Sequence, residues 1–271
     1  MSGNRKGILM KLSRLHSAAW LPIILGASTA QAHMPYVLPT QFDLGKADHV
    51  TVQSAFAEDA FLPEVAMRDA PFHLIGPNGK QLAIGPVAHL RDISMFEAAI
   101  PADGTYRVTS GLRAGRKGKM FKAGNDWKMR GEGSEPPAGA AEVDVQSMTL
   151  AEAYVTRGQP TQVALKPTGK ALEIQAMSHP NAIVAGTDAS FTLLFDGEPL
   201  AGADIALFRS AGLYDGRKVA AQVKSELDGR FVLRPQDAGT YLILVRHRAA
   251  APAGSETPYR SYTYTLAFDA A

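Results

Sequence analysis

Apolar and polar residues alternate with a period of two along much of the chain, which is the pattern of half-buried β-strands. Residues 49–56 and 95–100 follow it in the first half. In the first half, no stretch repeats apolar residues at helical spacing for more than two turns. The pattern therefore predicts an all-β protein.

Glycine-containing turns separate these strands. An Asn-Gly pair at residues 78–79 supplies the positive φ of a tight hairpin turn between residues 72–75 and 81–84. The run Pro-Ala-Asp-Gly at residues 101–104 turns the chain into another strand, where Tyr106 packs near the strand start. Both features are typical of a β-sandwich.

The second half gives a clearer pattern of short strands at regular spacing, with glycine turns between them. This spacing predicts an immunoglobulin-like or transthyretin-like sandwich. We therefore expect two β-sandwich domains, residues 33–168 and 169–271, joined by a linker at residues 167–170. The seven expected strands of the second domain are residues 171–176, 190–195, 203–209, 219–224, 230–233, 241–247 and 259–268.

Two segments of the first half depart from the alternating pattern. Residues 111–140 form a long basic loop with Phe121 and Trp127 interleaved among the cations. This loop is either a contact for an anionic partner or membrane surface, or a solvated hairpin whose aromatic rings pack back on the sheet. Residues 145–157 are compatible with a short helix or with a strand.

The first 32 residues have the composition of an export signal. A basic leader precedes an apolar block of about ten residues at positions 18–27, and Ala30-Gln31-Ala32 is a small-x-small cleavage site. Ten residues are too few to span a bilayer as a helix. We expect cleavage after Ala32, a periplasmic product and no stable membrane insertion after cleavage.

Removal of this leader changes the charge balance. The whole chain has 28 basic and 26 acidic residues, and the leader holds four of the basic ones, which leaves 24 against 26. Nothing global then favours nucleic acid as a partner. Cysteine is absent, so the core must supply stability without disulfides, and thiolate metal sites are excluded.

Cleavage after Ala32 would make His33 the first residue of the mature chain. A terminal histidine offers its α-amine and its imidazole at chelating distance, and the amine loses its proton easily to copper, nickel or zinc. Signal peptidase tolerates many residues after its site, so the histidine could also be accidental. His89, near a loop of the same domain, is our candidate for a second ligand.

The sequence holds no recognisable catalytic constellation. It lacks the Gly-x-Ser-x-Gly, Gly-x-Gly-x-x-Gly and His-Glu-x-x-His motifs. The adjacent carboxylates Glu58 and Asp59 are expected on opposite faces of a strand, where they could not share acid–base work. We therefore expect no enzyme activity.

Several segments resemble a bacterial periplasmic family of unknown-function domains that is associated with nickel uptake (NikK-like). They are Ala-His-Met-Pro-Tyr-Val-Leu-Pro at residues 32–39, Leu-Glu-Ile at 172–174, Gly-Glu-Pro-Leu-Ala-Gly-Ala at 197–203, Asp-Gly-Arg-Phe at 228–231 and Ala-Gly-Thr-Tyr at 238–241. The chain departs from the family by lacking the usual Trp after the histidine; Pro35 and Tyr36 stand there instead. The resemblance implies transition-metal binding, with nickel or cobalt as cargo, and copper stays open.

Three functions follow as hypotheses. The first is a periplasmic protein that binds a transition-metal ion through His33 or assists its uptake, with a metal transporter or TonB-dependent receptor as partner. The second is a non-catalytic sandwich module that docks on an outer-membrane receptor or transporter through loops such as residues 111–140. The third is a copper oxidase, which would need a second histidine converging on His33.

Overall fold

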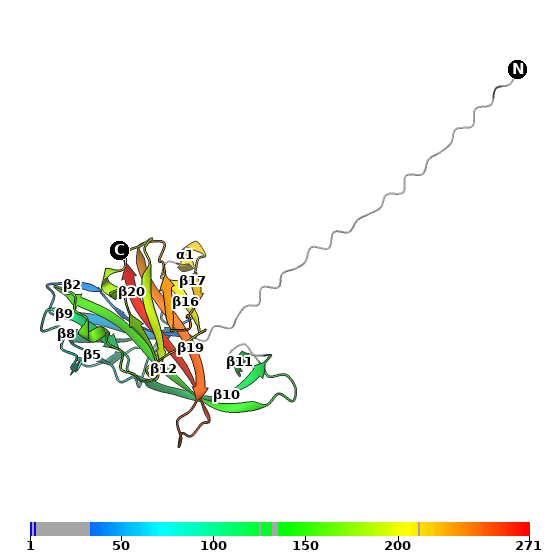
Figure 1. Cartoon of the computed structure of the whole chain (residues 1–271), viewed down its shortest axis with the longest axis horizontal. Coiled ribbons are helices and arrows are strands. Elements are labelled where there is room, and N and C mark those ends of the chain that lie inside the picture. Colours follow the sequence, from blue (N-terminus) through cyan, green and yellow to red (C-terminus); the bar gives the residue numbers. More distant parts are fainter. Residues whose placement is uncertain (2, 4–32, 125, 132–134, 211) are drawn as a thin grey trace.

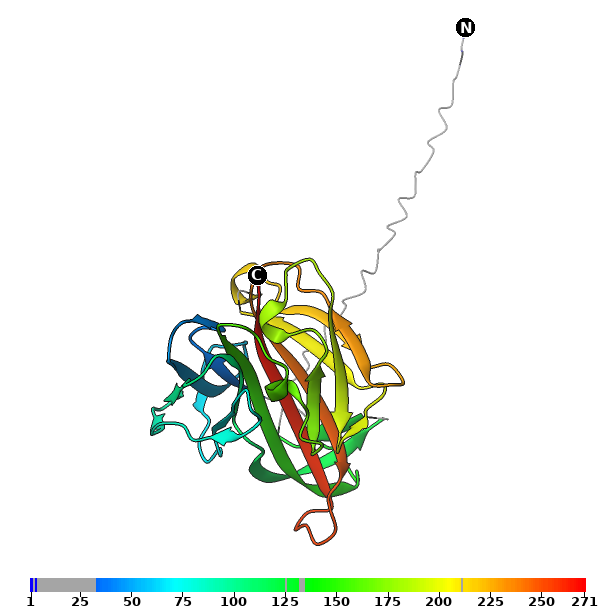
Figure 2. The ribbon, with the colours of Figure 1, turned by 60° about the vertical axis from the view of Figure 1, so that its left-hand side comes forward.

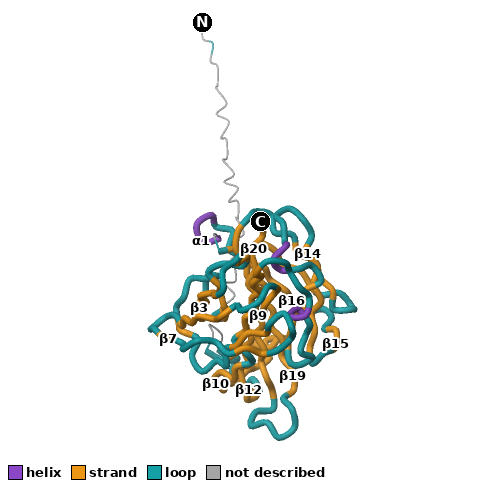
Figure 3. Tube along the Cα trace, turned by 90° about the vertical axis from the view of Figure 1, so that its left-hand side faces the viewer, coloured by secondary structure: helices purple, strands orange, loops and turns teal. Residues whose placement is uncertain are grey.

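The structure is a computed structural model, and it describes every residue except 2, 4–32, 125, 132–134 and 211. The expected export signal and its cleavage site therefore lie outside the described residues. The described chain is almost entirely strand and loop, with one short helix, α1 (Gly212–Asp215), and two single 3-10 turns (Figure 3). The all-β prediction is confirmed. No helix of the described part is long and apolar enough to cross a membrane.

The described strands form three sheets. The first contains β1 (Met34–Pro39), β3 (His49–Ala57), β8 (Ser94–Ala99) and β7 (Ala88–His89) in this order, with β4 (Val65–Ala66) paired to β3. A second, smaller sheet comes from the other half of the chain. It contains β13 (Leu172–Ala176), β14 (Ala189–Phe195), β15 (Glu198–Pro199) and β18 (Arg230–Leu233).

The third sheet is the largest and combines strands from both halves. Its main path is β17 (Val219–Lys224), β16 (Asp204–Arg209), β19 (Gly239–Ala250), β20 (Tyr259–Ala270), β12 (Glu142–Arg157), β9 (Gly104–Thr109), β5 (His73–Ile75) and β6 (Gln81–Leu82). Attached to β12 are β2 (Asp43–Gly45) and β10 (Arg113–Ala123), and β11 (Asp126–Met129) pairs with β10.

The large sheet lies between the two smaller ones, as Figure 2 shows. Strand β19 explains why. Leu242 and Leu244 belong to the hydrophobic core shared with β1 and β3, whereas Tyr241, Ile243 and Val245 belong to the core shared with β13 and β14. Successive side chains of a strand point to opposite faces, so a strand covered on both faces is apolar throughout. The run Tyr-Leu-Ile-Leu-Val at 241–245 has this composition.

The two expected domains are joined more closely than the sequence suggested. β12 of the first half pairs in parallel with β20 of the second, from Val145 opposite Tyr259 to Ala153 opposite Ala267. One core lies on each face of the large sheet, and each core takes residues from both halves, such as Leu242 in the first core and Tyr154 in the second. A boundary at residue 168 therefore divides the chain without dividing the large sheet.

The two irregular segments are strands for much of their length. Residues 145–157 belong to β12, so the helical alternative was wrong. The expected loop at 111–140 contains the β10–β11 hairpin, which extends away from the sheets (Figure 1). Phe121 is buried, and Trp127 packs against Tyr259 with ring centroids 5.8 Å apart.

A buried polar cluster lies on the large sheet where the halves meet. The Arg107 and Glu152 side chains are about 5 % exposed, with an Nη1–Oε1 distance of 3.6 Å. The Tyr264 hydroxyl donates to Glu152 Oε2 at 2.7 Å. Burial, and then the nearby Glu152 carboxylate, raise the pKa of Tyr264, so the phenol stays protonated and can donate. This cluster connects β9, β12 and β20.

Candidate metal centre

The start of β1, the end of β3 and the start of β4 meet at one end of the first sheet. β1 and β3 are antiparallel, with Met34 opposite Ala57, so His33 lies beside the residue that follows β3, which is Glu58. The chain then turns and returns as β4, in which Val65 lies opposite Phe56. Glu64 directly precedes β4, and its backbone N–H donates to the Phe56 carbonyl at 3.1 Å. The strand register thus brings His33, Glu58 and Glu64 together.

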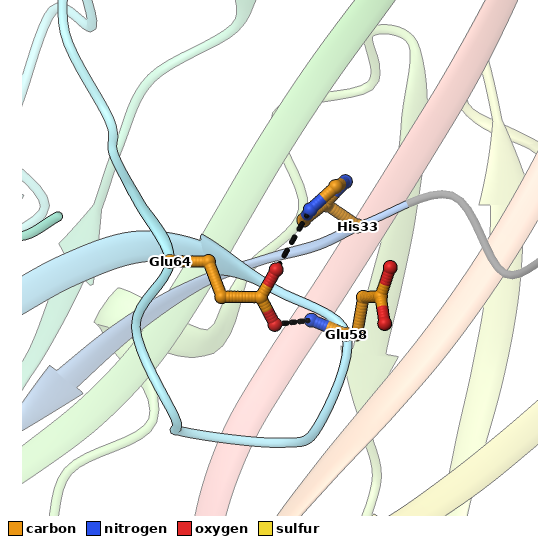
Figure 4. A group of neighbouring side chains, drawn as sticks. All are labelled: His33, Glu58 and Glu64. Atoms are coloured by element: carbon orange, nitrogen blue, oxygen red, sulfur yellow. Dashed lines mark hydrogen bonds and ion pairs between the residues drawn. The ribbon is translucent and has the colours of Figure 1, made fainter.

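The three side chains lie close to the spacing of ligands on one ion. One potential ligand atom from each of His33, Glu58 and Glu64 lies within 4.8 Å of the other two. His33 Nε2 is 2.9 Å from Glu64 Oε2, and Glu64 Oε1 accepts the backbone N–H of Glu58 at 3.0 Å (Figure 4). Two ligands about 2.1 Å from one ion lie at most roughly 4.2 Å apart, so small side-chain rotations would close the group on an ion.

The turn that carries the two glutamates is anchored at both sides. Phe61 has φ +67°, a left-handed conformation that is costly for a bulky residue, and its ring packs edge-on against Tyr36 at 5.4 Å. Asp59 pairs with Lys218 of the second half at 2.6 Å. Residues held in costly conformations tend to cluster at functional sites. These contacts fix where Glu58 and Glu64 lie relative to β1.

His89, the second expected ligand, lies at the opposite edge of this sheet. It belongs to β7 and pairs with Ser94 of β8, so β3 and β8 separate it from β1. Three inter-strand spacings amount to roughly 14 Å. The structure thus groups His33 with Glu58 and Glu64, and it does not bring His89 to this group.

His89 has a defined environment of its own. The Ser94 hydroxyl donates its proton to the Met67 carbonyl at 2.9 Å, so the 2.8 Å contact between His89 Nδ1 and Ser94 Oγ has the histidine as donor. The remaining lone pair of a neutral His89 is then on Nε2. Among the described residues, no cluster of three potential ligands includes His89.

The donor set at His33 suits divalent transition metals. Imidazole nitrogen favours nickel, copper, cobalt and zinc, and carboxylate oxygens complete the coordination of such ions. The His33 and Glu64 side chains are 43 % and 41 % exposed, so an ion could enter from solvent. The Glu58 side chain is exposed, and among the described residues its carboxylate has no hydrogen-bond or ion-pair partner.

The sequence alone did not reveal the two glutamates. Glu58 was expected within a strand, opposite in direction to Asp59, but β3 ends at Ala57 and both residues lie in the following turn. The sequence signal is a pair of acidic residues, Glu58 and Glu64, on either side of a short turn between two strands. It becomes informative only when the pairing of β1 with β3 is known.

These features define an all-β sandwich protein with a candidate metal centre at the ends of β1, β3 and β4. The model of a family described as a domain of unknown function, DUF4198, matches residues 30–249. The chain therefore belongs to the DUF4198 family. The match covers His33, both glutamates and most strands of both halves.

A comparison with curated proteins finds no match. Among solved structures, a DUF4785 family protein from Legionella pneumophila is similar over 78 % of this chain, at 11 % identity and a TM-score of 0.24. This chain covers half the length of that protein. The D0-D1 domain of intimin matches 86 % of this chain and 96 % of its own length, at 13 % identity and a TM-score of 0.22. The Yersinia pseudotuberculosis adhesin InvE matches 86 % of this chain and 58 % of its own, at 11 % identity and a TM-score of 0.22.

Proposed function

We propose that this chain is an exported periplasmic protein that binds a transition-metal ion at its mature N-terminus, or assists the uptake of that ion. The observation that carries the proposal is the convergence of His33, Glu58 and Glu64 within 4.8 Å at the start of β1. Cleavage after Ala32 would add the α-amine of His33 to this group. The ion is cargo in this proposal, and no catalysis is assigned to the chain.

The chemistry of the donors narrows the choice of ion. Two nitrogens and a carboxylate oxygen suit divalent nickel, cobalt, copper and zinc, whereas magnesium and calcium prefer sites built of oxygen alone. The resemblance to the nickel-associated periplasmic family favours nickel or cobalt, with copper as the further candidate. A metal transporter or a TonB-dependent receptor would be the partner that receives the ion.

Calorimetric titration with Ni²⁺ and Cu²⁺ tests the proposal. The mature chain that begins at His33 should bind one ion with a Kd below about 1 μM. A chain that begins at Thr29 keeps every side chain but moves the free amine four residues away, so it should bind at least tenfold more weakly. Shorter extensions are poor controls, because an amine one or two residues before a histidine chelates through backbone amides.

Two histidine variants complete the experiment. His33→Ala should abolish the binding, and His89→Ala should leave it unchanged because β3 and β8 separate His89 from the site. Equal and weak binding by the mature and the extended chains would contradict the proposal.

The projecting β10–β11 hairpin favours a second candidate function. It carries exposed cations beside the aromatic pair Trp127–Tyr259. The Lys122 Nζ atom lies 5.5 Å from the centroid of the Trp127 ring. Other cations of this segment are paired: Lys117 with Glu256, Lys119 with Asp144 and Arg130 with Glu142. The chain would then be a non-catalytic sandwich module that docks on an outer-membrane receptor or transporter. Loss of receptor binding in a Lys122→Glu, Lys128→Glu variant that still binds metal would support it.

A further inference from the structure

The Glu64 carboxylate uses both of its oxygens within the candidate site. Oε2 lies 2.9 Å from His33 Nε2, and Oε1 accepts the Glu58 backbone N–H at 3.0 Å. Figure 4 shows the carboxylate between the imidazole and the start of the turn. Glu64 therefore links the two other members of the group, whereas the Glu58 carboxylate has no such contact with the described residues.

This contact determines which imidazole nitrogen carries the proton. An ionised carboxylate can only accept hydrogen bonds, so His33 Nε2 must be the donor. In a neutral imidazole, the other nitrogen is then unprotonated. The lone pair of His33 that is available to a metal ion is on Nδ1.

The position of Nδ1 matters because it is the ring nitrogen nearer to the main chain. An ion bound to the α-amine and to Nδ1 closes a six-membered ring through Cα, Cβ and Cγ, and both lone pairs can point to one centre. The Nε2 lone pair points away from the amine of the same residue. The tautomer set by Glu64 is thus the one that permits chelation.

We propose that Glu64 is a positioning residue and that the α-amine, Nδ1 of His33 and the Glu58 carboxylate bind the ion. This inference rests on the proposed function and assigns a role to each side chain of the group. Glu64 holds the imidazole through Nε2–H and holds the Glu58 backbone through Oε1. Carboxylates that accept from a metal-bound imidazole fix its orientation in many metalloproteins.

The assignment specifies the class of ion. Three donors, two of them nitrogen, leave coordination positions for water or for a receiving protein, as a site for exchangeable cargo requires. The site would hold a divalent ion of the nickel, cobalt, copper and zinc group and would reject magnesium and calcium.

Three variants of the mature chain separate a ligand from a positioning residue, with Ni²⁺ as the probe. Glu64→Gln retains one side-chain carbonyl oxygen, which can accept from Nε2–H but cannot also accept from the Glu58 N–H, so its Kd should rise less than that of Glu64→Leu. Glu64→Leu cannot accept, and its Kd should rise about 10–100-fold. Glu58→Gln removes a charged ligand, and its Kd should rise at least as much as that of Glu64→Leu. Circular dichroism checks that each variant is folded.

The tautomer can be measured without metal, by ¹⁵N–¹H correlation of the His33 ring in the metal-free mature chain at a pH where the ring is neutral. We expect the proton on Nε2 in the parent chain. In Glu64→Leu, we expect no preference for Nε2 over Nδ1. A proton on Nδ1, or a Glu64→Gln variant as weak as Glu58→Gln, would overturn the assignment of Glu64 while metal binding remained. Absence of binding by the parent mature chain would instead overturn the proposed function.

Discussion

Tyr106 in the first half and Tyr241 in the second occupy equivalent positions. Each follows a Gly-Thr pair at the start of a strand, is almost fully buried, and donates its hydroxyl at 2.7 Å to the carbonyl four residues earlier, Ala102 or Asp237. Corners of this kind recur in immunoglobulin-like sandwiches. The two halves therefore share a structural device.

Both halves contain ion pairs, and the candidate site differs from these pairs. In the second half, Arg209 and Arg217 contact Asp215, and Arg234 contacts Asp188, at 2.7–2.8 Å. In the first half, the exposed Glu58 carboxylate lies beside His33 and lacks such a partner among the described residues. Paired charges satisfy each other, whereas a carboxylate and an imidazole with free lone pairs can bind a third group. Under the proposed function, the ion binds beside this unpaired carboxylate.

The largest loss of stability is expected at the buried cluster of Arg107, Glu152 and Tyr264, where strands of both halves meet. Glu152→Ala leaves the buried Arg107 charge without its counterion and the Tyr264 hydroxyl without its acceptor. Loss of one partner of a buried ion pair costs about 3–5 kcal/mol. Urea unfolding should show this loss. Asp204→Ala, which breaks the exposed pair with Lys224, is the matched control and should change little. Equal effects of the two variants would show that the buried cluster does not couple the halves.

A smaller and symmetrical effect is expected at the tyrosine corners. Tyr106→Phe and Tyr241→Phe each remove a hydroxyl that donates to one backbone carbonyl and accepts from the N–H of the same residue. Each should lower the free energy of unfolding by about 1 kcal/mol. The two values should agree within about a factor of two, as measured in the same urea titration. A negligible effect in one half alone would contradict the equivalence.

The smallest effect is a pH dependence at the junction of the halves. His179 Nδ1 accepts from the Asn181 N–H at 3.2 Å, so Nε2 donates to Thr105 Oγ1 of the first half at 2.9 Å. Burial lowers the pKa of His179 below its usual 6.5. His179 therefore binds a proton near pH 6.5 in the unfolded chain but stays neutral at that pH in the folded chain. The free energy of unfolding falls as the pH drops from about 6.5 toward the pKa of the folded state.

Replacement of this histidine should reduce that fall. His179→Gln should flatten the stability profile between about pH 7 and 5, as thermal unfolding at a series of pH values would show. Burial also lowers the pKa of His247, so part of the fall should persist. His49 is exposed and its pKa is raised by a hydrogen bond to Asp48, so His49→Gln should not reproduce the flattening. An unchanged slope in His179→Gln would contradict this interpretation.

The sequence predicted the strands better than their arrangement. Alternation located residues 49–56, because one face of β3 is buried and the other is partly exposed. The parallel pairing of β12 with β20 joins residues more than a hundred positions apart, and no local pattern encodes it. The apolar run at 241–245 indicated a strand, but a buried run does not reveal which sheets cover it.

The candidate site was predictable only in part. His33 followed from the expected cleavage site, which is a local signal. Glu58 and Glu64 join it through the register of β1 with β3 and through a turn that holds Phe61 at positive φ. His89 was chosen because it lies in the same half, but the order of strands sets it at the other edge of the sheet.

The most direct test of the account is a crystal structure of the mature chain with Ni²⁺, with anomalous data collected at the nickel absorption edge. The account predicts one strong anomalous peak about 2.0–2.2 Å from the His33 α-amine, His33 Nδ1 and a Glu58 oxygen. Glu64 should remain at hydrogen-bond distance from Nε2. A peak at another histidine, or none at the mature N-terminus, would contradict it.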